Sequence, residues 1–462
     1  MTELSVMAIS AGYSAGSLSV IDVVDGCLEQ LERVNPHLNA VITVNPEARA
    51  DAQASQERHR AGTPLSALDG VPVTVKDNLL VHGLRATWGT RLYENHIAGH
   101  DELPVETLRR SGAIIVGKTN VSEFTVGGFT DNPVFGATRN PLDTALSPGG
   151  SSGGAVASVA AGVVPLTLAT DGGGSIRRPA AHTGLVGFKP STGRVSRGAG
   201  FPVILGDFEV VGPIATNVSD VILAMGVLGQ PDPRDPLSRS FGPWNLAPAA
   251  TGTLPRLRIL AVEQIGEAPV DPEIRSSFRE AQVTLASLGH VVEPGALPFS
   301  IDAAGAWMEQ LVSLGLARLA TDHADFASLV SPRFAEQAVR GASLDVHPSE
   351  LDAALARFRG QVSTAYRDFD VILMPATAAQ PWPVEFEYPA EIDGKPVGPR
   401  GHAIFTGWVN AAGNPAVSIP IGRDRAGLPI GAQLIAGFGN DELSLRLALE
   451  LEAGLSASHS RR

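Results

Sequence analysis

Short runs of apolar residues, each bounded by Gly, Pro or Asn, alternate with helical patterns along this chain. Residues 71–75 and 113–116 are two clear examples of these runs. A run of this length between turn-forming residues is typical of a strand that is buried on both faces. Such strands need helices to cover them, so the pattern predicts an α/β fold.

Helical patterns are clearest near the two ends of the chain. Ser19 with Asp22 resembles a capping box, and the apolar spacing that follows predicts a helix that ends before Asn35-Pro36. An alanine-rich helix is expected over residues 47–60. Later strands are predicted at residues 370–374, 416–421 and 430–436, and a final helix at about 442–455.

Residues 229–367, between the predicted N-terminal and C-terminal strands, differ in composition and pattern. Residues 229–255 are rich in Pro, Gly and Ala, and the pattern up to about residue 367 is mostly helical, with one strand expected over 256–263. We therefore expect one domain over residues 1–462. Its core would span about 62–228 and 368–455, and residues 229–367 would form an insertion or lid layer.

Composition narrows the classes of partner. The formal net charge is −13, and a negative surface repels polyanions, so nucleic acid is not an expected partner. No uncharged apolar run reaches the roughly 18 residues that a membrane helix needs, so no membrane is expected. The N-terminus lacks the pattern of a secretory signal, which makes a cytoplasmic protein the default expectation.

No metal or other cofactor is expected from the sequence. Cys27 is the single cysteine, and its place in a helical pattern favours a plain core residue over a reactive thiol. His96 and His100 could bind a metal on one helix face, but Gly99 and the lack of a nearby Glu favour a solvated loop.

Two short motifs match known active-site patterns but stand in the wrong context. Residues 112–119 fit the phosphate-binding pattern G-x-x-x-x-G-K-[ST], yet their β-branched interior favours a buried strand over an exposed loop. Residues 149–153 fit the nucleophile elbow G-x-S-x-G, yet two prolines in residues 140–148 indicate a loop where that elbow needs a strand.

Residues 149–189 form the most informative stretch of the chain. Two serine sites, Ser151-Ser152 and Ser175, lie inside glycine runs, with a helix expected at about 154–161 and a strand at about 164–169 between them. Three glycines precede Ser175, so successive backbone N–H groups there can turn toward one point. This arrangement suits a developing oxyanion.

A serine nucleophile needs a base, and no His lies in these glycine runs. Lys76 ends a strongly apolar strand pattern. Burial in such a place lowers the pKa of a lysine and makes the neutral amine available. Lys76 is therefore the candidate base.

These residues resemble the amidase signature family. The resemblance rests on residues 149–189, on Val-Lys76-Asp-Asn, on Gly-Lys118-Thr-Asn120 followed by Glu123-Phe124, and on residues 414–420 and 427–433. It implies the fold of that family, with one central twisted mixed β-sheet flanked by helices on both faces. It also implies no cofactor, and because dimers are common in the family it leaves a homodimer open.

Carried over residue by residue, the Ser-cisSer-Lys triad of the family falls on Ser175, Ser151 and Lys76. Ser175 would be the nucleophile, Ser151 the bridging serine after a cis Gly150–Ser151 peptide bond, and Lys76 the base. The oxyanion donors would be the backbone N–H groups of Gly172, Gly173, Gly174 and Ser175. Ser152 is expected to hydrogen-bond near Lys76, and Asp171 and Arg177 to pair and hold the glycine turn.

The resemblance implies acyl transfer in two steps. Lys76 takes a proton from Ser151 while Ser151 takes one from Ser175, which attacks the carbonyl carbon. The relay then runs backward to protonate the leaving nitrogen, and water releases the acyl or carbamoyl group by the same route. The chain departs from the family at Ala169, usually Gly, and at Gly172, often a larger residue. We expect Gly172 to add room beside the oxyanion hole.

By family position, Thr125, Val126, Gly127 and Gly128 should line the pocket opposite Ser175. Arg194 and the loop up to Leu205 form its expected rim. The acidic C-terminal half does not resemble the glutamine-specific members that serve transfer-RNA amidation.

The expected partner is thus a small-molecule amide or carbamate, as for the aryl acylamidases and carbamate-cleaving urethanases of this family. The alternatives are an amidase restricted to primary aliphatic amides and a non-catalytic amidase-like assembly subunit. Nucleotide binding at residues 112–119 is a further alternative, which failure to bind ATP would remove.

Overall fold

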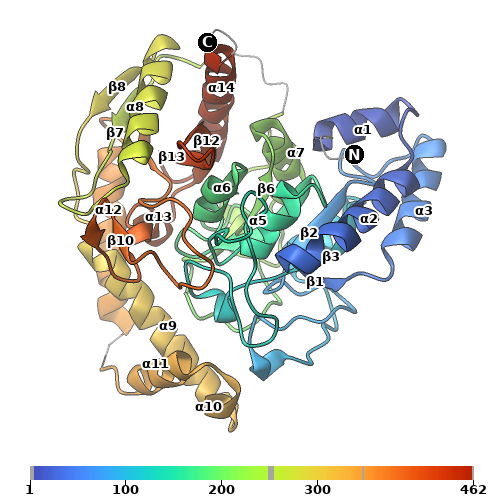
Figure 1. The fold of residues 1–462 in the computed structure, drawn as a ribbon, viewed down its shortest axis with the longest axis horizontal. Coiled ribbons are helices and arrows are strands. Elements are labelled where there is room, and N and C mark those ends of the chain that lie inside the picture. Colours follow the sequence, from blue (N-terminus) through green and yellow to red (C-terminus); the bar gives the residue numbers. More distant parts are fainter. Residues whose placement is uncertain (1–4, 248–253, 346–347, 460–462) are drawn as a thin grey trace.

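The computed structural model describes residues 5–247, 254–345 and 348–459, and a mixed sheet of eleven strands runs through its centre (Figure 1). The strand order is β1-β3-β2-β4-β6-β5-β12-β13-β9-β7-β8. These strands are β1 (Val41–Val44), β2 (Pro72–Lys76), β3 (Ile114–Thr119), β4 (Leu166–Asp171), β5 (Val186–Lys189), β6 (Val210–Ala215), β7 (Arg258–Ala261), β8 (Val291–Pro294), β9 (Val371–Pro375), β12 (Ala416–Arg423) and β13 (Pro429–Ala436). A separate hairpin pairs β10 (Glu391–Ile392) with β11 (Lys395–Pro396). The predicted α/β class and the central mixed sheet are confirmed.

Helices surround this sheet. They are α1 (Val6–Ser14), α2 (Val20–Leu38), α3 (Ala48–Arg60), α4 (Leu103–Arg110), α5 (Gly153–Ala160), α6 (Arg177–Thr183), α7 (Val218–Leu228), α8 (Pro272–Ser287), α9 (Asp302–Asp322), α10 (Phe326–Leu329), α11 (Pro332–Ala342), α12 (Pro348–Ala365), α13 (Gly407–Ala412) and α14 (Asp441–His459). Short 3₁₀ helices lie at Arg91–Tyr93, Glu123–Thr125, Ser238–Ser240 and Gly401–Ala403.

Successive residues of the central strands pack into different apolar clusters. Ile115 of β3 belongs to the main core, which includes α7, whereas its neighbour Val116 packs in a second cluster with α5 and α6. Leu168 and Ala169 of β4 divide in the same way. Because side chains alternate across a strand, helices cover both faces of the sheet here, which explains why its strands are continuously apolar.

Helix α2 begins where the sequence predicts but ends later. Ser19 caps it by accepting a hydrogen bond from the Asp22 N–H. The predicted end before Asn35-Pro36 is wrong, because the helix continues through Pro36 to Leu38 and ends at Asn39, whose φ is 52°. A proline in the last turn removes only one helical N–H, and the Asn35 side chain binds the chain just beyond the helix.

The segment predicted as a helical insertion also extends the sheet. Strands β7 and β8 lie beyond β9 and run parallel to it, and α8–α12 come from the same segment. Figure 1 shows α9, α10 and α11 together at one end of the molecule. Phe326 and Phe334 from these helices pack on Phe124, so this layer reaches the segment predicted to line the substrate pocket. The division into core and insertion stays a prediction.

The phosphate-binding pattern at residues 112–119 and the nucleophile-elbow pattern at residues 149–153 lie in a strand and after a loop, as their sequence context predicts. Gly117, Lys118 and Thr119 belong to the buried strand β3, where Lys118 Nζ pairs with Asp77 Oδ1 at 3.1 Å. Residues 140–148, before Gly149, contain turns and take part in two isolated bridges, Asn140 with Asp143 and Leu146 with Pro383. Neither motif has the geometry that its chemistry requires.

Other residues considered for chemistry are engaged elsewhere. His100 Nε2 contacts the Ala199 carbonyl at 2.7 Å, and Cys27 is half-buried with its pKa raised to about 12 by burial. Across the described ranges, no group of three or more His, Cys, Asp or Glu side chains could hold a metal ion. No helix in those ranges combines the length and apolar character that crossing a membrane requires.

Two helical glycines, one closely packed beside the serine sites and one in open space, allow the packing there to be tested by substitution. A Cβ at Gly154 of α5 would overlap the Asn120 backbone N and lie 2.5 Å from the Ala40 carbonyl, whereas Gly226 of α7 has nothing within 4 Å. We expect Gly154→Ala to lower the free energy of unfolding by about 1–3 kcal/mol. Gly226→Ala should raise it by about 0.5–1 kcal/mol, because alanine favours helix. Urea unfolding of the two variants measures both changes, and equal effects would contradict the close approach.

Candidate active site

The ends of two parallel neighbouring strands set the position of the site. Strand β2 ends at Lys76 and strand β4 ends at Asp171, with Val75 paired to Leu168. Parallel strands bring their carboxyl ends to the same edge of a sheet. Helix α5 starts directly after Ser151-Ser152 at this edge, and the glycine turn of residues 172–174 leads from β4 to Ser175.

Lys76 is fully buried and makes three hydrogen bonds. Its Nζ contacts Ser151 Oγ at 2.9 Å, Thr170 Oγ1 at 2.9 Å and the Thr170 carbonyl at 3.1 Å. Burial lowers the pKa of Lys76 to about 7, although Glu209 and Asp171 act in the opposite direction. A large fraction of this lysine is therefore neutral near pH 7, as a base requires.

The two neighbouring serines differ in their contacts. The Gly150–Ser151 peptide bond is cis, and Ser151 Oγ faces Lys76. Ser152 Oγ donates to the Thr170 carbonyl at 3.3 Å, the same oxygen that Lys76 contacts. Among the residues that the structure describes, no hydrogen bond joins Ser151 to Ser175, so this step of the relay stays a prediction.

The glycine turn is held by the Asp171 carboxylate. Its Oδ1 accepts the Gly174 N–H at 2.7 Å and its Oδ2 accepts the Ile176 N–H at 3.1 Å. This removes Gly174 from the predicted oxyanion donors, because its N–H points to the carboxylate. The N–H groups of Gly173 and Ser175 make no hydrogen bond to a described residue, and with Gly172 they remain the predicted donors.

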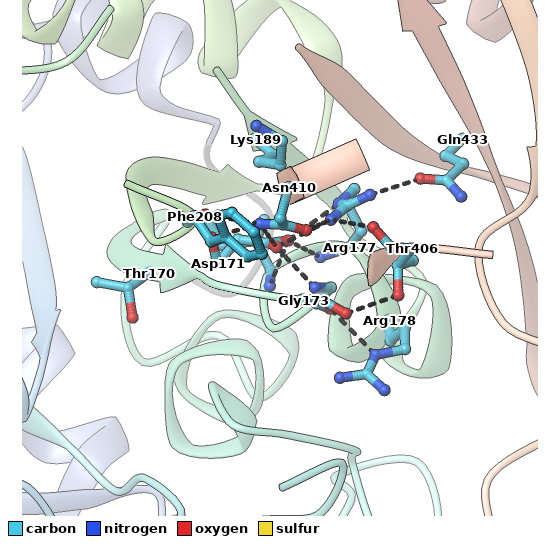
Figure 2. Close-up of polar contacts among 12 residues, drawn as sticks. Thr170, Asp171, Gly173, Arg177, Arg178, Lys189, Phe208, Thr406, Asn410 and Gln433 are labelled. Atoms are coloured by element: carbon cyan, nitrogen blue, oxygen red, sulfur yellow. Dashed lines mark hydrogen bonds and ion pairs between the residues drawn. The ribbon is translucent and has the colours of Figure 1, made fainter. Parts of the chain in front are cut away.

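A buried polar network fixes Asp171 (Figure 2). Asp171 and Arg177 form an ion pair with 2.9 and 3.0 Å contacts, and both side chains are fully buried. Arg177 also donates to Asn410 Oδ1 at 2.6 Å and Gln433 Oε1 at 2.9 Å. Burial acts to raise the pKa of Asp171, but the Arg177 guanidinium holds it far below its usual range. The pair supports the turn structurally, as the sequence predicts.

A second acidic group lies near the lysine and has no signal in the sequence motifs. Glu209 Oε1 pairs with Arg197 at 2.6 Å and lies 3.5 Å from Asn78 Nδ2, while Thr125 Oγ1 donates to its Oε2 at 3.3 Å. Asn78 in turn donates to Thr170, which binds Lys76. Glu209 thus connects the base to the predicted pocket segment.

The predicted substrate-binding residues separate in the structure. Thr125, Val126 and Gly127 lie together next to Trp88, whose Nε1 donates to Thr125 Oγ1 at 3.4 Å. Arg194 lies elsewhere: its guanidinium rests over the rings of Phe241 and Trp244 and donates to the Gly242 carbonyl at 2.6 Å. The two aromatic rings hold the Arg194 guanidinium by cation–π contacts. No contact among the described residues joins Arg194 to the triad.

Gly172 does not leave an open space. A Cβ on Gly172 would lie 2.7 Å from Leu205 Cδ1 and 3.6 Å from Glu209 Cβ. Leu205 therefore fills the space that a side chain at position 172 would take. The expectation that Gly172 adds room beside the oxyanion hole is wrong.

Sequence reasoning also missed Arg178 and His402, on the other side of the glycine turn. Arg178 Nε donates to the Gly174 carbonyl at 3.4 Å, and its Nη1 lies 3.1 Å from His402 Nε2. The only signal was the adjacent basic pair Arg177-Arg178, and Arg109-Arg110 is an equal pair elsewhere in the chain. His402 comes from a distant part of the sequence, so no local pattern could join it to the site.

Comparison with known proteins identifies the family. Residues 22–445 match the profile of the family described as Amidase. A glutamyl-tRNA(Gln) amidotransferase subunit from Synechococcus sp. (strain CC9605) is 32% identical, over 99% of this chain and 98% of the relative. The predicted contrast with the C-terminal half of such subunits is not supported, because the alignment includes that half.

Solved structures show the same fold. A bacterial aryl acylamidase of the amidase signature family superposes with a TM-score of 0.88 at 28% identity, covering 98% of this chain and 96% of the other. A 6-aminohexanoate cyclic dimer hydrolase superposes with a TM-score of 0.87 at 26% identity, covering 98% and 97%. The predicted resemblance is confirmed, and this chain belongs to the amidase family, as an amidase-signature hydrolase.

Proposed function

We propose that this protein hydrolyses C–N bonds of small amides and carbamates that carry an apolar or aryl group, through an acyl- or carbamoyl-enzyme on Ser175. The observation that carries the proposal is the 2.9 Å contact between Lys76 and Ser151 in a fully buried setting. A buried lysine without a carboxylate partner is costly unless it is neutral, and a neutral amine is a base.

The reaction begins with proton transfer toward Lys76. Neutral Lys76 takes a proton from Ser151, Ser151 takes one from Ser175, and the Ser175 oxygen attacks the carbonyl carbon. The N–H groups of Gly173 and Ser175 stabilise the oxyanion that forms. The protons return through Ser151 to the leaving nitrogen, and water then hydrolyses the acyl- or carbamoyl-enzyme by the same relay.

Aromatic side chains support an aryl or apolar substrate. Trp88 stacks on Phe201 with ring centroids 5.1 Å apart and meets Phe124 edge-on at 5.3 Å. These rings adjoin Thr125 on the predicted pocket segment, and Val203 in the same loop as Phe201 is exposed. The solved aryl acylamidase has the same fold, which agrees with this choice of substrate.

Glutamine amide transfer is the second candidate, because the curated relative named above is a glutamyl-tRNA(Gln) amidotransferase subunit. In that case glutamine would be the amide substrate and the protein would need partner subunits. The net charge of −13 does not favour direct contact with tRNA, which supports hydrolysis without such partners.

The nucleophile is tested with purified protein and a substrate panel of 4-nitroanilides, aliphatic amides, glutamine, aryl carbamates and esters. We expect hydrolysis of an anilide and a carbamate, and a loss of roughly 10³-fold or more in kcat for Ser175→Ala. Ser418→Ala is the matched control, because Ser418 Oγ is buried without a hydrogen bond to any described residue and its removal should leave kcat unchanged. Comparable turnover by Ser175→Ala would refute the nucleophile, and turnover of glutamine alone would favour the second candidate.

The base is tested by the pH dependence of kcat/KM. Because Lys76 must be neutral and its pKa is lowered to about 7, kcat/KM should rise about tenfold per pH unit below pH 7 and level off above it. Lys189 is also buried with a pKa lowered to about 7, and within the described part of the chain its Nζ donates to the Pro190 carbonyl alone. The rise should persist in Lys189→Met, and a flat profile between pH 5.5 and 9 would contradict the role of Lys76.

A further inference from the structure

Glu209 belongs to a cluster of ionic groups beside the base. Arg197 pairs with Glu102 at 3.1 Å and with Glu209 at 2.6 Å. The Glu102 side chain is buried, and its Oε2 makes no hydrogen bond to a described residue. In their ionised forms, two carboxylates thus share one guanidinium. The cluster carries a negative charge that no group within it balances.

Polar side chains link this cluster to Lys76. Glu209 Oε1 lies 3.5 Å from Asn78 Nδ2, which donates to Thr170 Oγ1 at 3.1 Å. That hydroxyl oxygen also accepts a hydrogen bond from Lys76 Nζ at 2.9 Å. Figure 2 shows Thr170 apart from the polar network that surrounds Arg177. The cluster therefore reaches Lys76 along a route that is separate from the ion pair at the glycine turn.

The other acidic groups around Lys76 have cations of their own. Asp77, next to Lys76 in the chain, pairs with Lys118 of β3 at 3.1 Å, and Asp171 of β4 pairs with Arg177 at 2.9 Å. Helix α5, which packs on β2, carries no titratable side chain, and the side chains that α2 buries in the core shared with β2 are valines. Within the described ranges, the cluster around Arg197 is therefore the source of unbalanced negative charge beside the base.

The proposed reaction creates a cation at Lys76. As Ser175 attacks, Ser151 takes the Ser175 proton and gives its own proton to Lys76, while an oxyanion forms on the substrate carbonyl. Lys76 is then an ammonium in a fully buried place, where a charge without a partner is costly. The backbone N–H groups that bind the oxyanion cannot stabilise this cation. A negative group on the Lys76 side can.

We propose that Glu209 is a positioning residue whose carboxylate, shared with Arg197 and Glu102, is the counter-charge for the Lys76 ammonium that forms during the attack by Ser175. This inference rests on the proposed hydrolysis and adds a group that favours each proton transfer toward Lys76. The same carboxylate also favours the ammonium before the reaction starts, so it helps to set the pH at which the base becomes neutral.

The charges that act on Lys76 agree with this role. Burial has the largest influence and lowers the pKa of Lys76, whereas Glu209 and Asp171 act to raise it and Arg197 acts to lower it. Glu209 and Arg197 therefore act in opposite directions on the same base. Removing one or the other must shift its titration in opposite directions.

The test measures kcat/KM for a 4-nitroanilide against pH in Glu209→Gln, which removes the charge and keeps the shape of the side chain. The pH at half of the plateau should fall by about 0.5–1 unit, because an ammonium without its counter-charge loses its proton more readily. The plateau should fall about three- to tenfold, because the ammonium formed in the attack is less stable. A purely structural residue would lower the plateau and leave the midpoint in place.

Companion variants separate charge from packing. Arg197→Gln should raise the midpoint by about 0.5–1 unit, because it removes the cation of the cluster. Glu209→Asp keeps the charge, so its midpoint should lie closer to the wild type than that of Glu209→Gln. Glu293→Gln is the matched control, because Glu293 pairs with Arg258 on the edge strand β8, remote from β2. It should change neither the midpoint nor the plateau.

Two outcomes of these profiles would overturn the proposal. One is a midpoint that stays or rises in Glu209→Gln, and the other is a midpoint that stays or falls in Arg197→Gln. If one of these variants does not fold, the other decides by itself.

Nuclear magnetic resonance separates this inference from the hydrolysis on which it rests. The lysines of the sequence are Lys76, Lys118, Lys189 and Lys395. A carbon label at lysine Cε therefore gives few signals, and the signal that is lost in Lys76→Met belongs to Lys76. Its titration midpoint should fall in Glu209→Gln and rise in Arg197→Gln. If no amide or carbamate is hydrolysed yet these shifts are seen, the counter-charge stands and the proposed hydrolysis fails. If Lys76 titrates alike in all three proteins, the counter-charge is wrong.

Discussion

The buried ion pair between Asp171 and Arg177 joins parts of the chain that are far apart in sequence. Asp171 ends β4 and accepts two N–H groups of the turn that carries Ser175, while Arg177 reaches Asn410 and Gln433 near the C-terminus. Removing one partner would leave a buried charge uncompensated, at a cost of about 3–5 kcal/mol. The shape of the glycine turn, and the positions of the strands around it, therefore depend on this pair.

The same turn separates two electrostatic environments. On one side Lys76 is desolvated among hydroxyl and carbonyl groups, with Glu209 near enough to limit the fall of its pKa. On the other side Arg178 and Arg400 lie without acidic partners within ion-pair distance among the described residues. A proton relay works best where the base is neutral. One short glycine segment keeps the two apart.

Similarity to relatives does not by itself choose the substrate. The glutamyl-tRNA(Gln) amidotransferase subunit and the aryl acylamidase each align with nearly the whole chain. Substrate choice depends on the side chains that line a site and not on the fold. In this chain, rings from the loop after β5 and from the α9–α11 layer pack on Trp88 and Phe124.

Local patterns determined most of the strands, the end of β2 at Lys76 and the serine-containing glycine runs, because apolar burial and glycine conformations are properties of short segments. They could not show that α2 continues through Pro36 or that Leu205 fills the space at Gly172. They also could not show that Gly174 donates to Asp171, or that Arg178 meets His402. Each of these features depends on contacts between segments far apart in sequence, or on a backbone direction within a turn, so only the tertiary structure decided them.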